Sequence, residues 1–296
     1  MIVIPGPSSL GLGWRIAEAL GVEPHPVEHR IFPDGESYIR LTKPVAGEKV
    51  IIIQTTAPNP DSKLIQLLLM AETAKDFGAD KIIAVVPYLA YARQDKRFLE
   101  MEALSLDVII NLLEASGVTD LVVVNIHNEV SIRAIEEKHS VKIHNLSAVS
   151  LLAEYLKGRG FDNAYSLSPD KGAIYIAEAA SKILGGGYNH FEKTRDRKTG
   201  EIKMEVKNLN ISGRGAVVFD DMISSGGTMA KAVEELIAQG AEKVAAACTH
   251  VLYMPGAEEK IRRAGADLIL STDTIETPFS QVTVAGLIAT TLKGLA

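Results

Sequence analysis

The sequence has little of two things that would indicate particular classes of protein: cysteine and long apolar runs. Cys248 is its one cysteine, so no disulfide can form within the chain, as is usual in a reducing cytoplasm. Its neighbours, Ala245 to Ala247, predict a buried strand in which the thiol is packed and unreactive. No apolar run approaches the roughly 18 residues that a membrane span needs.

Excess positive charge is also absent. The formal net charge is −6, whereas a nucleic-acid-binding protein normally presents a basic face. A phosphate site is still possible, because it is a local arrangement of donors. The N-terminus enters an apolar strand at Ile2 without the basic and long apolar regions of a signal peptide. We therefore expect a cytoplasmic protein with no nucleic-acid or membrane partner.

Short apolar runs alternate with longer amphipathic segments along the 296 residues. The runs are nearly continuous in apolar residues, which is typical of parallel strands that helices cover on both faces. In the first half, the pattern predicts strands over 50–53, 82–86 and 121–124 and helices over 61–77 and 104–115. The sequence therefore predicts an α/β fold, with mostly parallel sheets flanked by helices.

The second half repeats this pattern and some of its residues. Gly78–Ile82 leads to Tyr91, and the similar stretch Gly240–Val244 leads to Tyr253 at the same offset. Chance similarity between βα units and an ancient duplication both explain this repeat. Duplication predicts two similar domains, 1–146 and 147–296, and a site between such domains would suit two phosphorylated substrates.

A polar segment interrupts the α/β pattern at about 185–210. It opens with the triple glycine Gly185–Gly187 and is rich in charged residues. Glycine loses much backbone entropy on ordering, and this segment has few apolar residues to offset the loss. Two interpretations stay open: a solvated β-hairpin without a role, or a mobile lid that carries cations over an anionic substrate.

The most specific pattern runs from Val217 to Thr228: an apolar strand, two carboxylates, and a loop of small residues that leads into a helix. Backbone N–H groups of such a loop can bind a phosphate, helped by the positive end of the helix dipole. Its glycines remove side chains that would block the ligand, and adjacent carboxylates suit ribose hydroxyls. The predicted sugar-phosphate ligands are Asp220, Asp221, Ser224, Ser225, Gly226, Gly227 and Thr228.

This stretch closely resembles the motif that binds 5-phosphoribosyl 1-diphosphate (PRPP) in phosphoribosyltransferases and PRPP synthetases. Two N-terminal stretches resemble the ATP-binding motifs of the ribose-phosphate pyrophosphokinase (PRPP synthetase) family. By itself, Phe32–Glu36 indicates a surface turn, whereas Pro87–Lys96 gathers polar groups at the carboxyl end of a strand, where α/β sheets bind ligands. The resemblance implies that adenine stacks on Phe32 and that Arg93 and Gln94 reach the triphosphate. The implied ATP-binding residues are Phe32, Asp34, Gly35, Glu36, Arg93, Gln94, Asp95 and His127.

The same resemblance implies a Mg²⁺ cofactor, with His127 and Asp170 as its protein contacts. From the residues alone, His127 could be structural, and Asp170 could simply cap a helix. Asn125 stands where many family members have Asp, which puts in doubt a carboxylate that orients the imidazole of His127. Ala173 likewise replaces a family glycine in the segment after Asp170.

Lys193 and Arg195 resemble the cations of the family's catalytic flexible loop, so we expect both to be catalytic and Arg195 also to bind ribose 5-phosphate. The resemblance covers essentially the whole chain. It implies transfer of the β,γ-diphosphoryl group of ATP to O1 of ribose 5-phosphate, which gives PRPP and AMP. The PRPP would serve nucleotide biosynthesis, and the resemblance also implies a homo-oligomer. Two alternatives are a non-catalytic regulatory relative and a phosphoribosyltransferase that consumes PRPP.

Overall fold

The computed structural model describes residues 1–195, 202–205, 209 and 211–295, which divide into two compact units. Unit 1 consists of Met1–Ser147 and Thr283–Ala296, and unit 2 of Ala148–Val282. Sequence alone predicts a division after residue 146, with the C-terminal segment in the second domain. In the structure that segment forms α9 (Ala285–Leu295), which packs against α1 (Leu10–Leu20) of unit 1.

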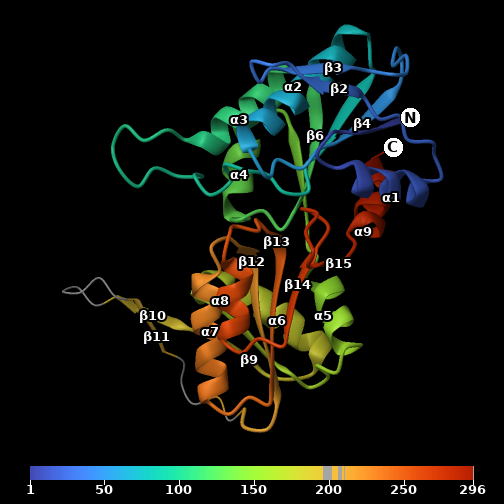
Figure 1. Ribbon diagram of the computed structural model, residues 1–296. Coiled ribbons are helices and arrows are strands. Elements are labelled where there is room, and N and C mark those ends of the chain that lie inside the picture. The colour runs from blue at the N-terminus through green and yellow to red at the C-terminus, as the bar shows by residue number, and fades with distance from the viewer. Residues whose placement is uncertain (196–201, 206–208, 210, 296) are drawn as a thin grey trace. The chain divides into compact units, whose positions relative to one another are not determined.

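The sheet of unit 1 is parallel throughout, in the order β1-β4-β5-β6-β7. Its strands are apolar and mostly buried because α2 and α3 cover one face and α1 with α9 the other (Figure 1). The strands are β1 (Ile2–Pro5), β4 (Lys49–Ile53), β5 (Lys81–Val85), β6 (Val118–Val124) and β7 (Lys142–Leu146). The other helices are α2 (Pro60–Asp76), α3 (Ser105–Ala115) and α4 (Val130–Glu136).

Unit 2 contains a second parallel sheet, in the order β15-β14-β13-β12-β8-β9. Side chains alternate along β12, so Val217 and Phe219 pack toward α5 and α6, while Ala216 and Val218 pack toward α7 and α8. The strands are β8 (Tyr165–Ser168), β9 (Tyr188–His190), β12 (Gly215–Ile223), β13 (Lys243–Val251), β14 (Leu268–Thr272) and β15 (Ser280–Val282). The helices are α5 (Val149–Lys157), α6 (Ile174–Leu184), α7 (Gly227–Ala238) and α8 (Ala257–Arg263).

The predicted α/β fold is thus confirmed in both units, and Cys248 is fully buried in β13 as expected. Helices among the described residues lack the combination of length and apolar character that a membrane crossing requires. The repeated stretches run into the first two residues of β5 and of β13. The tyrosines that follow them, Tyr91 and Tyr253, both adopt positive φ, at 66° and 50°. The repeat therefore extends to a backbone conformation that is uncommon for tyrosine.

The polar segment at 185–210 contains an antiparallel hairpin of β10 (Glu192–Arg195) and β11 (Ile202–Glu205), in which Lys193 pairs with Met204. Gly186 lies against β8, where a Cβ atom would come within 2.0 Å of the carbonyl oxygen of Ala164. This close approach gives one reason for the triple glycine. Residues 196–201, 206–208 and 210 of the predicted lid lie outside the described part of the chain.

A buried carboxylate joins neighbouring strands of unit 1. Asp120 of β6 is 3% exposed; Lys81 Nζ lies 3.0 Å from one carboxylate oxygen, and His144 Nε2 lies 2.9 Å from the other. Burial alone would raise the pKa of Asp120, but the hydrogen bonds from His144, Lys81 and Thr119 outweigh it and hold the pKa below its ordinary value.

We expect Asp120→Asn to lower the free energy of unfolding by about 2 kcal/mol near neutral pH, because Lys81 and His144 lose their charged partner. The folded-state pKa is depressed, so this stabilisation is present above the unfolded-state pKa and is lost as the pH falls through the folded-state value. Denaturant titrations at about pH 7 and pH 3 should show the difference shrinking at the lower pH. Asp107→Asn, which removes the more exposed pair with Lys138, is the control and should cost less than about 1 kcal/mol.

Candidate functional site

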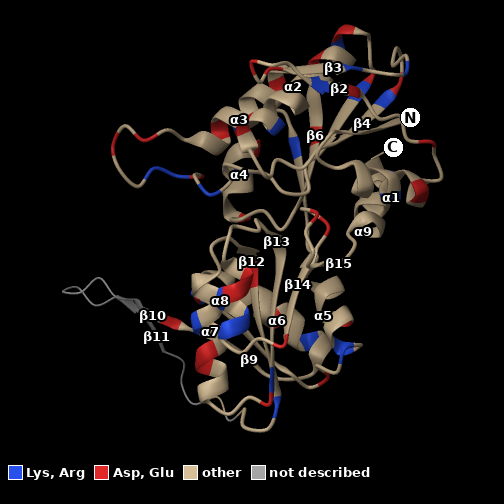
Figure 2. Ribbon diagram, in the orientation of Figure 1, with Lys and Arg blue, Asp and Glu red and all other residues tan. Residues whose placement is uncertain are grey.

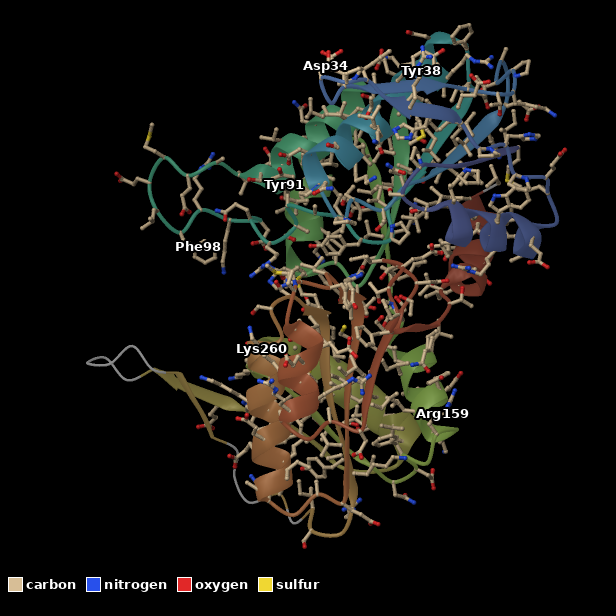
Figure 3. The ribbon with its side chains drawn as sticks, viewed as in Figure 1. Asp34, Tyr38, Tyr91, Phe98, Arg159 and Lys260 are labelled. Carbon is tan, nitrogen blue, oxygen red and sulfur yellow. The ribbon has the colours of Figure 1, made fainter. Side chains whose placement is uncertain are left out.

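The predicted phosphate loop has the expected strand–loop–helix form. β12 ends at Ile223, Ser224 to Gly226 form the loop, and α7 begins at Gly227. The loop therefore lies at the carboxyl edge of the sheet, with the first N–H groups of α7 beside it. Lys260 of α8 donates to the carbonyl oxygen of Ser225 at 3.4 Å, and the Ser224 hydroxyl lies 3.1 Å from the sulfur of Met254. These contacts tie the loop to α8, on which Lys260 is labelled (Figure 3), and to Met254 in the segment before that helix.

Gly226, at the end of this loop, and Gly227, at the start of α7, have different surroundings. Gly226 has a φ of 76°, and a Cβ atom there would lie 2.8 Å from the carbonyl oxygen of Ala257. Gly226 is therefore required by the backbone turn and by the close approach of α8. A Cβ atom at Gly227 would meet nothing within 4 Å, and its φ is not positive. Of the two glycines that the sequence assigns to ligand access, Gly227 is the one that borders open space.

Negative charge accumulates where β12 approaches this loop. Burial raises the pKa of Asp220 well above its usual range, and the charges of Asp221 and Asp170 raise it further. Asp170 follows β8, the neighbour of β12, and accepts a hydrogen bond from the Gly172 N–H at 3.0 Å. The capping role that was left open for Asp170 is thus present. The excess negative charge also makes this part of unit 2 suitable for a cation or for the hydroxyl donors of a sugar.

The chemistry of these side chains fits a Mg²⁺ ion that is held mainly by a ligand. Magnesium prefers oxygen donors and keeps several waters, binding proteins through few carboxylates together with substrate phosphates. In the described residues, His, Cys, Asp and Glu side chains form no group of three that could hold a metal ion. A cation here would therefore need phosphate oxygens or water to complete its coordination.

In unit 1, the stretch Phe32–Glu36 forms the turn between β2 (Glu28–Ile31) and β3 (Ser37–Arg40), which pair antiparallel. Phe32 N–H donates to the carbonyl oxygen of Glu36 at 2.8 Å, and Asp34 accepts from the Glu36 N–H at 3.2 Å. Gly35 supplies the positive φ of 95°. The predicted turn is confirmed, and Phe32, 38% exposed, has a ring that a ligand can reach.

A second polar group in unit 1 comes from the loops that follow the adjacent strands β5 and β6. Asp95 accepts a hydrogen bond at 2.5 Å from Asn128, the residue after His127. Sequence reasoning missed Asn128, since a hydrogen bond across 33 residues leaves no local signal. Gln94 uses its amide hydrogens within its own loop, donating to the carbonyl oxygen of Lys96 at 3.1 Å and to Glu102 at 3.3 Å. In this conformation Gln94 offers a ligand an acceptor oxygen rather than the donor that a triphosphate needs.

The structure describes Asn125 completely, but it describes only the backbones of Lys193 and Arg195. Asn125 is buried with a φ of 42°, in the left-handed region that asparagine tolerates better than most residues. The backbones of Lys193 and Arg195 lie in β10, but their side chains are outside the described part of the chain. The predicted ATP ligands thus lie in unit 1, and the phosphate loop with Asp170 in unit 2.

The raised pKa of Asp220 predicts how unit 2 responds to pH without ligands. The folded state favours the protonated acid, so stability is full below the ordinary pKa of aspartate and declines as the pH rises through the folded-state value. Asp220→Asn removes this ionisation and should stabilise the ligand-free protein by on the order of 1–2 kcal/mol near pH 8, with little effect near pH 4. Thermal unfolding at both pH values measures the effect. The exposed Asp162→Asn is the control, and a destabilised Asp220→Asn at pH 8 would contradict the prediction.

Comparison with known proteins agrees with this architecture. Residues 1–117 match the family model for the N-terminal domain of ribose phosphate pyrophosphokinase, and residues 150–282 match that for the phosphoribosyl transferase domain. The fold expected for each half, that of a phosphoribosyltransferase-type domain, is therefore confirmed.

Relatives match over the full length. The ribose-phosphate pyrophosphokinase of Methanosarcina acetivorans is 40% identical over 296 residues, which is 100% of both chains. That of Methanothermobacter thermautotrophicus is 38% identical over 99% of this chain and 100% of its own. The crystal structure of phosphoribosylpyrophosphate synthetase from Mycobacterium smegmatis superimposes with a TM-score of 0.87 at 26% identity, covering 99% of this chain and 98% of that one. The chain belongs to the ribose-phosphate pyrophosphokinase family.

Proposed function

We propose that this protein transfers the β,γ-diphosphoryl group of ATP to O1 of ribose 5-phosphate, forming PRPP and AMP. The observation that carries this proposal is the Asp pair near the end of β12 and the loop that leads from it into α7, in a chain that matches ribose-phosphate pyrophosphokinases from end to end. O1 attacks the β-phosphorus, the bond to the α,β-bridging oxygen breaks, and the O1 proton is released. Such a transfer depends mainly on positioning and charge neutralisation.

Unit 2 would bind ribose 5-phosphate. The N–H groups at the start of α7, with the hydroxyls of Ser224, Ser225 and Thr228, would hold the 5-phosphate. Asp220 and Asp221 would accept hydrogen bonds from the ribose hydroxyls, and a nearby cation would stabilise their ionised forms. Burial and the charges of Asp221 and Asp170 raise the pKa of Asp220, and a cation bound nearby would lower it again, which supports this role.

Unit 1 would bind ATP. Adenine would stack on Phe32, with Asp34 and Glu36 beside its polar edge and Gly35 permitting the turn. Arg93 suits the triphosphate, because its guanidinium can donate two parallel hydrogen bonds to phosphate oxygens. The residues assigned to the nucleotide after β5 and β6 are Arg93, Gln94, Asp95 and His127.

Mg²⁺ would neutralise phosphate charge and polarise the phosphorus that is attacked, and His127 and Asp170 are the residues that would hold it. Lys193 and Arg195 of β10 would stabilise the charge that develops on the transferred oxygens, and Arg195 would also contact ribose 5-phosphate. Both residues lie on a hairpin whose first strand, β10, begins two residues after the end of β9, a strand of the sheet of unit 2. This position supports the proposed role.

The alternatives fit less well. A phosphoribosyltransferase that consumes PRPP does not account for the match of 1–117 to the N-terminal domain of a pyrophosphokinase. A non-catalytic relative would have no need of the phosphate loop together with Lys193 and His127.

We also propose that the protein is a homo-oligomer, because α2 and α3 expose large apolar side chains: Ile65, Leu69, Val108 and Leu112. Lysine, arginine and acidic residues are interspersed over each unit, which supports the absence of a nucleic-acid partner (Figure 2).

The direct test is to incubate the protein with ATP, ribose 5-phosphate and Mg²⁺ and to measure AMP and PRPP. We expect equal amounts of both and none without Mg²⁺. Lys193→Ala should lower kcat by roughly a hundredfold or more while leaving the Kd of each substrate within a few-fold, because its charge acts mainly in the transition state. Wild-type protein that binds both substrates but forms no PRPP would support the non-catalytic alternative.

The two loop glycines provide a test of the phosphate site. Gly227→Val adds a side chain to open space without backbone strain, so it should leave the melting temperature nearly unchanged. It should raise KM for ribose 5-phosphate about tenfold, roughly 1.4 kcal/mol, and leave KM for ATP within twofold. Gly286→Val, at another glycine with open space around it, is the control. Gly226→Ala should instead lower stability. If Gly227→Val changes KM for ATP alone, the assignment of ribose 5-phosphate to unit 2 and of ATP to unit 1 is wrong.

A further inference from the structure

The segment between β5 and α3, residues 93–104, extends away from the body of unit 1 (Figure 1). It exposes the apolar side chains of Phe98, Leu99 and Met101, which are 66%, 71% and 98% exposed, and Phe98 is labelled on this loop (Figure 3). A hydrophobic core therefore does not hold this part of the loop in place. Ordering a residue costs roughly 1–2 kcal/mol of backbone entropy, so polar contacts must define the loop's shape.

Glu102 supplies these contacts. Its Oε2 atom accepts hydrogen bonds from the backbone N–H groups of Phe98 at 2.7 Å and Leu99 at 3.1 Å, and from the side-chain amide of Gln94 at 3.3 Å. Its carbonyl oxygen accepts from Arg97 Nε at 2.9 Å. The N–H groups of Phe98 and Leu99 hold the pKa of Glu102 below its ordinary value, so the carboxylate is charged near neutral pH, and hydrogen bonds to a charged acceptor are the stronger kind.

Through these bonds Glu102 connects the exposed end of the loop to its start. Gln94 is held by its backbone as well: its N–H donates to the carbonyl oxygen of Tyr91 at 3.1 Å, and its own carbonyl oxygen accepts from the Leu106 N–H at 3.3 Å. Glu102 therefore fixes the side chain of a residue whose backbone is already anchored. Arg93 precedes Gln94 directly, so the shape of the loop also determines where the guanidinium of Arg93 can reach.

We propose that Glu102 is a positioning residue for ATP: its carboxylate keeps the loop that carries Arg93 in the conformation that receives the nucleotide, with Gln94 held as part of the loop's framework. This inference rests on the proposed ATP-binding role of Arg93. Preorganisation increases affinity by removing the ordering cost that binding would otherwise meet. Glu102 needs no contact with ATP to have this effect.

The test compares Glu102→Ala with Glu100→Ala, which removes the same charge from an exposed position in the same loop. Calorimetry with Mg²⁺ and ATP should give a Kd about tenfold higher for Glu102→Ala and within twofold of wild type for Glu100→Ala. The Kd for ribose 5-phosphate should stay unchanged in both variants. Amide hydrogen exchange at Phe98 and Leu99 should accelerate in Glu102→Ala alone. Glu102→Gln keeps acceptor oxygens but loses the charge, and its Kd for ATP should be intermediate.

The inference is overturned if Glu102→Ala binds ATP as the wild type does, or if it weakens both substrates equally, as a general loss of structure would. Accelerated exchange with unchanged ATP affinity would leave Glu102 as a support for the loop only, and that outcome also overturns it. The proposed function fails by a different result, namely wild-type protein that neither binds ATP nor forms PRPP.

Discussion

Helices cover both faces of each parallel sheet, so polar chemistry is confined to the ends of the strands. In unit 2, β12 is apolar from Ala216 to Phe219 and becomes acidic only at Asp220, next to the loop. In unit 1, Arg93 and His127, which are proposed to reach the triphosphate, likewise follow β5 and β6. Because the strands are parallel, their carboxyl ends meet at one edge of each sheet, and loops that are distant in sequence become neighbours there. The hydrogen bond from Asn128 to Asp95 is an example.

Carboxylates gather near this edge in unit 2. Asp220 and Asp221 are adjacent in the chain, and burial together with the charges of Asp221 and Asp170 raises the pKa of Asp220. A cation bound near these carboxylates would lower the pKa of Asp220 again.

Much of this could be predicted from sequence because the signals are local. Continuous apolar runs determine buried parallel strands, and the observed α2 and α3 begin and end within a residue of the predicted ranges 61–77 and 104–115. The strand, carboxylates and small-residue loop from Val217 to Thr228 specify their own geometry, since each part depends only on its neighbours in the chain. The turn at Phe32–Glu36 follows from proline and glycine in the same way.

The amino-acid sequence by itself therefore determined the fold class, several of the strands and helices, and the strand–loop–helix form of the predicted phosphate loop. Only the tertiary structure decided which contacts join distant residues, because a local pattern does not encode a partner many positions away. It placed α9 on unit 1 through its packing on α1. It separated Gly226, which faces the carbonyl oxygen of Ala257, from Gly227, which borders open space. Glu102 likewise becomes more than a surface carboxylate only when the loop folds its backbone N–H groups toward it.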